Sequence, residues 1–290
     1  MTNRLGLGTV QLGLPYGIAS GGRQVDMESA RAIVTCAYEN GLTTLDTAIG
    51  YGESESRLGE IGVSQFKVVT KLPAIPRSCQ DISAWVTEAV GASRQRLQIS
   101  RLYGLLLHHP QDLAGPDGDA LYRALVGVRA NGLVGKIGVS VYGPDELDAV
   151  CSRGDFDIVQ APFNIVDRRL ETSGWLARLG RAHTEIHVRS VFLQGLLLMT
   201  PDKRPAIFGS RRSLWERWDR WLQEASVKPL EACLGFALSR PEIDRVIVGV
   251  DSVRQLREIL SSAAVPISQP PNDLSSEDMD LINPSRWHAK

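Results

Sequence analysis

The chain has 290 residues, of which 43% are hydrophobic and 22% are charged, and its formal net charge is -1. This length suits one large α/β domain whose core needs no disulfide staples. The near-zero charge gives no electrostatic case for a nucleic-acid partner or an anionic membrane. No apolar run is long enough for a signal peptide or a membrane span, so we expect a cytoplasmic location.

Four cysteines lie far apart and form no CxxC pair. This spacing is typical of small buried side chains in a reducing compartment, and it predicts neither a metal site nor a disulfide framework. The residues concerned are Cys36, Cys79, Cys151 and Cys233.

Strand and helix patterns alternate along the chain. Strands are predicted over 5–10, 43–46, 66–71, 102–107, 136–141, 156–160, 186–192 and 245–250. Helices are predicted over 27–39, 53–61, 82–97, 120–130, 144–151, 171–182, 229–239 and 253–260, and another carries Trp215, Trp218 and Leu222. Asp26 and Asp81 stand where N-caps of the first and third of these helices belong.

Eight strands that alternate with helices, with no linker between two halves, favour parallel pairing in a closed (β/α)₈ barrel. We expect residues 1–265 to form this single barrel domain and residues 266–290 to form an irregular tail near the active-site mouth. An open, doubly wound sheet is the rival fold. It is disfavoured because Gln11 stands where a GxGxxG motif needs its third glycine.

Four reactive side chains follow successive predicted strands. Asp46 ends the second strand, Tyr51 lies in the loop after it, Lys71 ends the third strand, and His108 ends the fourth. Chemistry in such barrels sits at the carboxyl ends of the strands, and neighbouring strand ends lie about 5 Å apart. These four groups are therefore expected to converge in one catalytic site, although each alone could be a turn, surface or loop residue.

Segments in the same order along the chain resemble the motifs of the aldo-keto reductase family. They are Asp46-Thr-Ala-Ile-Gly-Tyr51-Gly-Glu53 with Leu58-Gly59, Lys71, Leu107-His108-His109-Pro110, Gly135-Lys-Ile-Gly-Val-Ser140, Val159-Gln160-Ala-Pro-Phe-Asn164, Phe192-Leu-Gln-Gly195-Leu-Leu, and Val248-Gly249 through Gln255-Leu256-Arg-Glu258. The resemblance covers nearly the whole chain.

The resemblance implies hydride transfer between a nicotinamide cofactor, NAD(P)H, and a carbonyl or alcohol group. Tyr51 is then the general acid and base, assisted by Lys71 and Asp46, while His108 orients the carbonyl. It also implies a set of cofactor-binding residues along the later strand ends. These are Ser140, Gln160, Arg189, Ser190, Leu193, Gly195, Gly249, Asp251, Ser252, Gln255 and Glu258.

Three positions depart from the family pattern. Val141 replaces an asparagine that often binds the carboxamide, and Arg189 replaces an aromatic residue that stacks on the nicotinamide. A guanidinium can stack but repels the positively charged oxidised ring, so we expect reduced cofactor to bind better than oxidised cofactor. Asp251 suits a ribose hydroxyl better than a phosphate, which gives a slight lean toward NADH over NADPH.

The expected substrate is a small aldehyde, ketone or sugar, which the loop sequences do not identify further. The alternative is a reductase-like sensor that binds nicotinamide and signals to a protein partner, with little or no turnover. Tyr51 argues against the sensor, because signalling needs no general acid. A barrel hydrolase or aldolase with Lys71 as a Schiff-base amine leaves the motifs after strands seven and eight unexplained.

Overall fold

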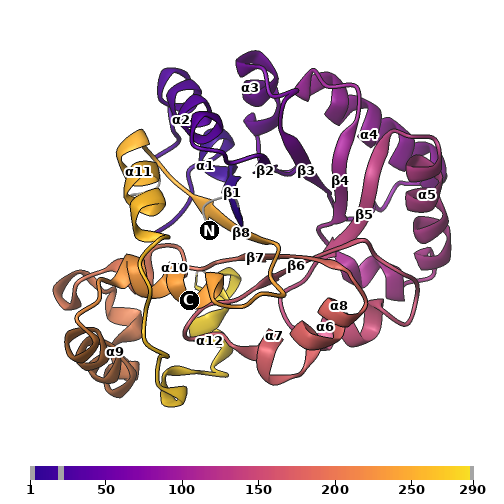
Figure 1. Cartoon of the computed structure of the whole chain (residues 1–290). Coiled ribbons are helices and arrows are strands. Elements are labelled where there is room, and N and C mark those ends of the chain that lie inside the picture. The colour runs from indigo at the N-terminus through magenta and orange to yellow at the C-terminus, as the bar shows by residue number, and fades with distance from the viewer. Residues whose placement is uncertain (1–3, 19–22, 288–290) are drawn as a thin grey trace.

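The computed structural model describes residues 4–18 and 23–287, and its centre is a closed barrel of eight parallel strands in chain order (Figure 1). The strands are β1 (Leu5–Gly8), β2 (Thr44–Asp46), β3 (Lys67–Leu72), β4 (Leu102–Leu107), β5 (Val134–Ser140), β6 (Ile158–Pro162), β7 (Glu185–Arg189) and β8 (Arg245–Gly249). Strand β1 pairs with both β2 and β8, which closes the ring. The prediction of a (β/α)₈ barrel is confirmed.

A main helix follows each strand and packs outside the barrel (Figure 1). In chain order these are α2 (Met27–Glu39), α3 (Ser54–Ile61), α4 (Ile82–Leu97), α5 (Gly118–Ala130), α6 (Pro144–Val150), α8 (Trp175–Arg181), α10 (Pro229–Leu238) and α11 (Val253–Ser262). Asp26 and Asp81 cap α2 and α4 as predicted, because their carboxylates accept the backbone N–H of Ser29 and Ala84.

Additional helices lie in the connecting loops and the tail. They are α1 (Val10–Gly13), α7 (Arg169–Thr172), α9 (Arg212–Ala225) and α12 (Met279–Ile282), with 3₁₀ turns η2 (Pro110–Ala114), η3 (Leu196–Leu198), η4 (Pro201–Lys203), η5 (Ala206–Arg211), η6 (Asn272–Leu274) and η7 (Pro284–Arg286). The loop from β7 to α9 carries three of these turns and helps to build the site described below.

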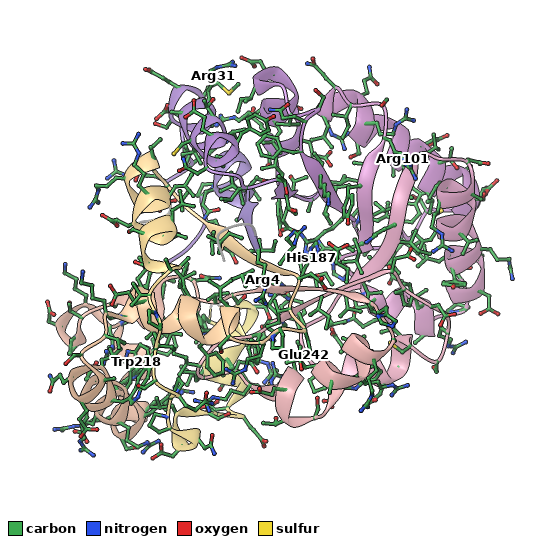
Figure 2. The ribbon with its side chains drawn as sticks, viewed as in Figure 1. Arg4, Arg31, Arg101, His187, Trp218 and Glu242 are labelled. Carbon is green, nitrogen blue, oxygen red and sulfur yellow. The ribbon has the colours of Figure 1, made fainter. Side chains whose placement is uncertain are left out.

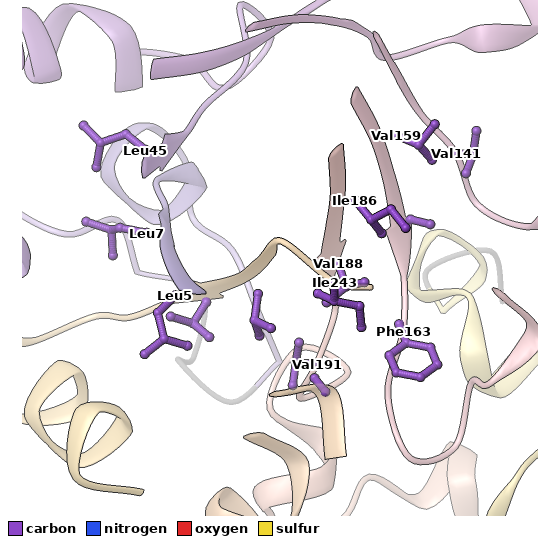
Figure 3. Packing of buried hydrophobic residues seen from close by; sticks show 14 of the residues in the cluster. Leu5, Leu7, Leu45, Val141, Val159, Phe163, Ile186, Val188, Val191 and Ile243 are labelled. Atoms are coloured by element: carbon purple, nitrogen blue, oxygen red, sulfur yellow. The ribbon is translucent and has the colours of Figure 1, made fainter. Parts of the chain in front are cut away.

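The strands are buried on both faces, as their apolar sequences predict. Leu5, Leu7 and Leu45 belong to the large core between strands and helices (Figure 3). Val69, Leu106 and Ile158 form a separate cluster inside the barrel.

A polar cluster occupies the amino-terminal half of the barrel. Glu185, the first residue of β7, lies 2.8 Å from Nε2 of the fully buried His187 and accepts a 2.7 Å hydrogen bond from the Tyr103 hydroxyl (Figure 2 labels His187). These residues lie at the opposite end of the strands from the residues expected to be catalytic, and we attach no chemical role to them.

Several element boundaries differ from the sequence expectation, and two of the differences follow from backbone with positive φ. The helix expected over 171–182 is split, because Gly174 adopts a φ of 81° between α7 and α8. The strand expected over 186–192 stops at Arg189, because Ser190, Leu193 and Gln194 have φ values of 59°, 45° and 52°. Left-handed backbone cannot continue a strand, so these residues form a loop at the carboxyl end of β7.

An acidic residue in the first turn of a helix commonly caps it or faces water, but Glu55 in the first turn of α3 does neither. Its side chain is buried, accepts hydrogen bonds from Thr70 and Ser93 at 2.6 and 2.7 Å, and forms an ion pair with Arg96 at 2.6 Å. The carboxylate therefore ties α3, which follows the catalytic loop, to β3 and α4.

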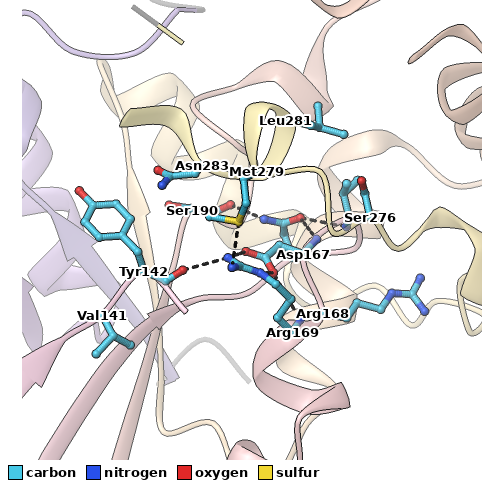
Figure 4. A network of polar contacts seen from close by, with 12 residues as sticks. Val141, Tyr142, Asp167, Arg168, Arg169, Ser190, Ser276, Met279, Leu281 and Asn283 are labelled. Atoms are coloured by element: carbon cyan, nitrogen blue, oxygen red, sulfur yellow. Dashed lines mark hydrogen bonds and ion pairs between the residues drawn. The ribbon is translucent and has the colours of Figure 1, made fainter. Parts of the chain in front are cut away.

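The tail packs along the loops after β5 and β6. Arg169 forms an ion pair with Asp167 at 2.8 Å, donates to the Tyr142 carbonyl at 2.9 Å and contacts the sulfur of Met279 at 3.2 Å (Figure 4). Trp287 is buried against the edge of the Phe208 ring, with centroids 4.9 Å apart. The described part of the tail thus braces the barrel end that carries the site.

Candidate active site

A cavity of about 550 Å³ opens at the carboxyl ends of the strands. All four residues expected to be catalytic line it, together with most of the residues expected to bind cofactor. The lining residues that the sequence identified are Asp46, Tyr51, Lys71, His108, Ser140, Gln160, Arg189, Ser190, Gly195, Gly249, Asp251, Gln255 and Glu258. Trp287, which belongs to the tail that we expected near the mouth of the site, is not in its wall.

Lys71 lies at the bottom of the catalytic end and is held by a buried ion pair. Its Nζ is 2.7 Å from Oδ2 of Asp46 and donates to the Thr47 carbonyl at 2.8 Å. Burial alone would lower the pKa of this lysine, but the charge and hydrogen bond of Asp46, together with Tyr51, outweigh burial and raise the pKa above its ordinary value. Lys71 is therefore a fixed cation at neutral pH.

Tyr51 and His108 lie over this pair. The Lys71 ammonium is 5.0 Å from the centroid of the Tyr51 ring, and the Tyr51 and His108 rings meet edge to face at 5.8 Å. Burial, together with the charges of Lys71 and Arg189, lowers the pKa of His108 to about 4. At neutral pH His108 is therefore an uncharged imidazole, which can donate one hydrogen bond without adding positive charge.

A chain of hydrogen bonds links the ion pair to the next two strands. The Gln160 side-chain amide donates to Oδ1 of Asp46 at 2.6 Å, and the Ser140 hydroxyl donates to Oε1 of Gln160 at 3.0 Å. Both residues lie on adjoining positions of β5 and β6. The bonds fix the orientation of the Gln160 amide and of Asp46 together.

Arg189, the last residue of β7, reaches across the end of β6 toward β5. It donates to the Val141 carbonyl at 3.0 Å and to the Ser190 hydroxyl at 3.2 Å. Its guanidinium also lies 4.7 Å from the centroid of the Tyr142 ring. No ion pair joins it to a carboxylate within residues 4–18 and 23–287, and it lies close enough to the catalytic end for its charge to affect Lys71 and His108.

The other end of the cavity is formed by the loop after β8 and the first turns of α11. The Ser252 hydroxyl accepts the N–H of Gln255 and so caps α11, while the Gln255 side chain accepts the N–H of Asp251 at 2.7 Å. Burial raises the pKa of Asp251. Glu258 forms an ion pair with Arg254 at 3.1 Å.

Some residues in the wall were not identified from the sequence, and two that were identified lie elsewhere. Leu193 is fully buried and Ser252 serves as a helix cap, and neither lines the cavity. The lining also includes Gln11, Tyr16 and Tyr142. Gln11 and Tyr16 follow β1. They could have been identified from the sequence, because active sites of such barrels form from the loops after the strands.

A sequence model of the Aldo/keto reductase family matches residues 4–273. The chain belongs to the aldo-keto reductase family. A D-threo-aldose 1-dehydrogenase from Pseudomonas sp is 27% identical over 88% of this chain and 90% of its own length. The human aflatoxin B1 aldehyde reductase member 4 is 31% identical over 45% of this chain and 41% of its own. The holo form of aldo-keto reductase AKR11C1 from Bacillus halodurans shares the fold, with a TM-score of 0.71 and 21% identity over 91% and 88% of the two chains.

This aldo-keto reductase is therefore an oxidoreductase that uses a nicotinamide cofactor. Its cavity fits such a group, because buried oxygen atoms of Gln11 and Asp251 in the wall have no hydrogen-bond partner in the described chain. Gly249 also matters here, since a Cβ at this position would lie 2.3 Å from the Gln11 side chain. Within the described residues, no helix is both long and apolar enough to cross a membrane.

Proposed function

We propose that this enzyme interconverts a small carbonyl compound and its alcohol, with Tyr51 as the general acid and base. The substrate is an aldehyde, a ketone or a sugar. The observation that carries the proposal is the buried Lys71–Asp46 pair at 2.7 Å beneath the Tyr51 ring, in the wall of the same cavity as His108.

Each catalytic group has a distinct task in this proposal. A free phenol, with a pKa of about 10, is a weak acid at neutral pH. With the Lys71 cation beside its ring, Tyr51 gives its proton to the oxygen of a carbonyl that is being reduced and takes it back in the reverse direction. Asp46 holds Lys71 in place. The neutral His108 donates a hydrogen bond that orients the carbonyl oxygen.

The bound nicotinamide supplies or accepts the hydride, and the protein positions it. Ser140 and Gln160 are the proposed partners of the carboxamide, and the hydrogen-bond chain from them to Asp46 supports this assignment. Gly249, Asp251, Gln255 and Glu258 are the proposed contacts of the adenosine end.

The expectation of a preference for NADH has no support beyond Asp251. Arg254 lines the same end of the cavity and its side chain is 80% exposed, so a cation is available to a 2′-phosphate as well. The preference between NADH and NADPH is tested by measuring both dissociation constants, by cofactor fluorescence, in the native protein and in Arg254→Gln. A loss of affinity for NADPH alone in the variant assigns Arg254 to the phosphate.

Turnover on a panel of aldehydes, ketones and aldoses tests the proposed function. Aldoses belong in the panel because the Pseudomonas relative is named for one. We expect NAD(P)H oxidation or NAD(P)⁺ reduction that falls at least about 100-fold in Tyr51→Phe. Turnover that survives in Tyr51→Phe contradicts the mechanism. Tight cofactor binding without turnover on any member favours the sensor, which would need a protein partner.

A further inference from the structure

The proposed reaction places the substrate over one half of the barrel mouth. The reacting carbonyl must lie beside Tyr51 and His108, which follow β2 and β4. The first four strands and the loops after them therefore form the part of the wall that the substrate contacts. With the exception of Val10, the side chains that the described residues of this half add to the wall are polar. They are Thr9, Gln11, Tyr16, Asp46, Tyr51, Lys71 and His108.

The large apolar side chains of the wall lie in the other half of the barrel. They come from β8, from the loop after β7 and from the helices α10 and α11, and they are Val191, Phe192, Leu198, Leu230, Ile247 and Ile259. This half also carries the proposed cofactor contacts Gly249 and Gln255. A substrate with an apolar chain therefore finds little apolar surface beside the reacting groups, and it costs free energy to cover polar groups without giving them hydrogen bonds.

Tyr16, in the loop after β1, is a phenol of the substrate half to which the proposed mechanism gives no role. It lies close enough to the catalytic Tyr51 for the charge of one phenol to affect the other. Tyr16 lines the cavity and is 40% exposed, so a ligand in the cavity can reach its ring and its hydroxyl. The side chain of Gln194, from the loop after β7, lies within hydrogen-bonding reach of the same phenol.

The chemistry of this phenol matches that of an alcohol group. Partial burial raises the pKa of Tyr16, so its hydroxyl stays protonated at neutral pH and can donate a hydrogen bond. The same oxygen can accept one. The ring offers a flat apolar face to the C–H groups of the carbon that carries the alcohol. An unsubstituted alkyl chain would use the face of the ring but not the hydroxyl.

We propose that Tyr16 binds a hydroxyl group of the substrate next to the reacting carbonyl, so that the enzyme prefers hydroxyaldehydes, hydroxyketones and short aldoses to apolar carbonyl compounds. The closeness of Tyr16 to Tyr51 places this hydroxyl on a carbon near the carbonyl. A site that hydrogen-bonds a substrate hydroxyl discriminates against the analogue that lacks it, because the polar group of the site then loses a partner. This inference rests on the proposed function, because it names the class of substrate for the same site.

Matched pairs of short carbonyl compounds test the proposal. The pairs are propanal with 2-hydroxypropanal, propanal with glyceraldehyde, and butanone with 1-hydroxybutan-2-one, all of them too short to close into a stable sugar ring. Values of kcat/KM are expressed per unhydrated carbonyl, measured by NMR, because hydroxyaldehydes hydrate in water. In the native enzyme we expect kcat/KM to be at least about fivefold higher for the hydroxylated member in two or more of the pairs.

The variants separate binding from the reactivity of the compounds themselves. Tyr16→Phe keeps the ring and removes the hydroxyl. The preference for hydroxylated substrates should then fall by about 3- to 10-fold, mainly through KM, as expected for one hydrogen bond between uncharged groups. Tyr38→Phe is the matched control, because it removes the hydroxyl of an exposed tyrosine of α2 that does not line the cavity. It should leave the preference unchanged.

Two results overturn the proposal while the proposed function stands. One is a preference below this level in two or more of the pairs. The other is a preference that is the same in Tyr16→Phe as in the native enzyme, which would assign it to the reactivity of the compounds alone. Turnover that survives in Tyr51→Phe contradicts the proposed function instead, and the comparison with Tyr16→Phe still decides the role of Tyr16.

Binding is measured separately, so that a failure of turnover does not leave the proposal open. Calorimetric titration of 1-hydroxybutan-2-one and of butanone into Tyr51→Phe protein saturated with reduced cofactor gives dissociation constants without reaction. Tighter binding of the hydroxyketone, lost in Tyr51→Phe/Tyr16→Phe, supports the proposal even if the native enzyme turns over neither compound. Equal binding of the two compounds contradicts it.

Discussion

The Asp46→Asn substitution should destabilise the protein strongly, because it leaves a buried cation without its counter-ion. The side chains of Lys71 and Asp46 are 1% and 7% exposed, and they lie 2.7 Å apart. Removing one partner of a buried pair typically costs about 3–5 kcal/mol. Asn has one side-chain oxygen where Asp46 has two, so it cannot accept hydrogen bonds from both Lys71 and the Gln160 amide through separate oxygens. The hydrogen bond between Gln160 and Ser140 must then rearrange as well.

The free energy of unfolding should be measured from reversible urea transitions at pH 7. The matched control is Glu216→Gln, which breaks an exposed ion pair of the same 2.7 Å length and should cost less than about 1 kcal/mol. Lys71→Met in the Asp46→Asn background removes the stranded charge. The double variant should therefore be more stable than Asp46→Asn alone by at least about 1 kcal/mol.

The pH dependence gives a second test of the same reasoning. In the native protein the pKa of Lys71 is raised, so its stabilising contribution is present below about pH 10.4 and is lost only as the pH rises through the higher folded value. Without Asp46, burial should depress this pKa instead. The stability gap between the native protein and Asp46→Asn should then narrow from pH 7 to pH 10. A constant gap, or a double variant no more stable than the single one, refutes the argument.

Three further predictions concern the site and its support. In Tyr51→Phe turnover should be lost, while the dissociation constant of the reduced cofactor, measured by fluorescence, should stay within about threefold of the native value. Loss of cofactor binding would instead make Tyr51 a cofactor ligand. Because the pKa of His108 is lowered to about 4, the plot of kcat/KM against pH should show no inflection from His108 between pH 5 and 8. An inflection near pH 6.5 that disappears in His108→Gln would contradict this. Oxidised cofactor should bind at least about tenfold more weakly than reduced cofactor, and the difference should shrink in Arg189→Tyr; equal constants would refute the repulsion.

The barrel and the four catalytic candidates were predictable because they depend on local patterns. The apolar run Leu102–Leu107 gives a buried strand at the predicted residues, and Asp26 caps its helix because a carboxylate satisfies a free backbone N–H. Once the strand ends are known, parallel closure brings Asp46 and Lys71 onto neighbouring strands without any further information.

The parts that the sequence did not reveal depend on contacts between distant residues. Glu55 looks like a surface residue of a short helix, and only its position against Thr70 and Arg96 buries it. The loop after β7 contains non-glycine residues with positive φ, a conformation that single-residue preferences disfavour, so the strand was predicted three residues too long. The hydrogen bond from Arg189 to the Val141 carbonyl links the ends of β7 and β5 across β6. No spacing in the sequence predicts this contact.

The same geometry gives the departures at Val141 and Arg189 a common physical basis. Where the family pattern has an asparagine side chain after Ser140, this chain offers only the Val141 carbonyl, and Arg189 donates to that carbonyl. The aromatic surface that the pattern expects at the end of β7 is instead Tyr142, which lies beneath the guanidinium. In this chain the two departures therefore meet, because Arg189 at the end of β7 donates to the carbonyl of Val141, the residue after β5. Restoring the aromatic residue alone, as in Arg189→Tyr, leaves the Val141 carbonyl without its donor. For this reason the variant should recover binding of the oxidised cofactor only in part, and Arg189→Tyr combined with Val141→Asn should recover more.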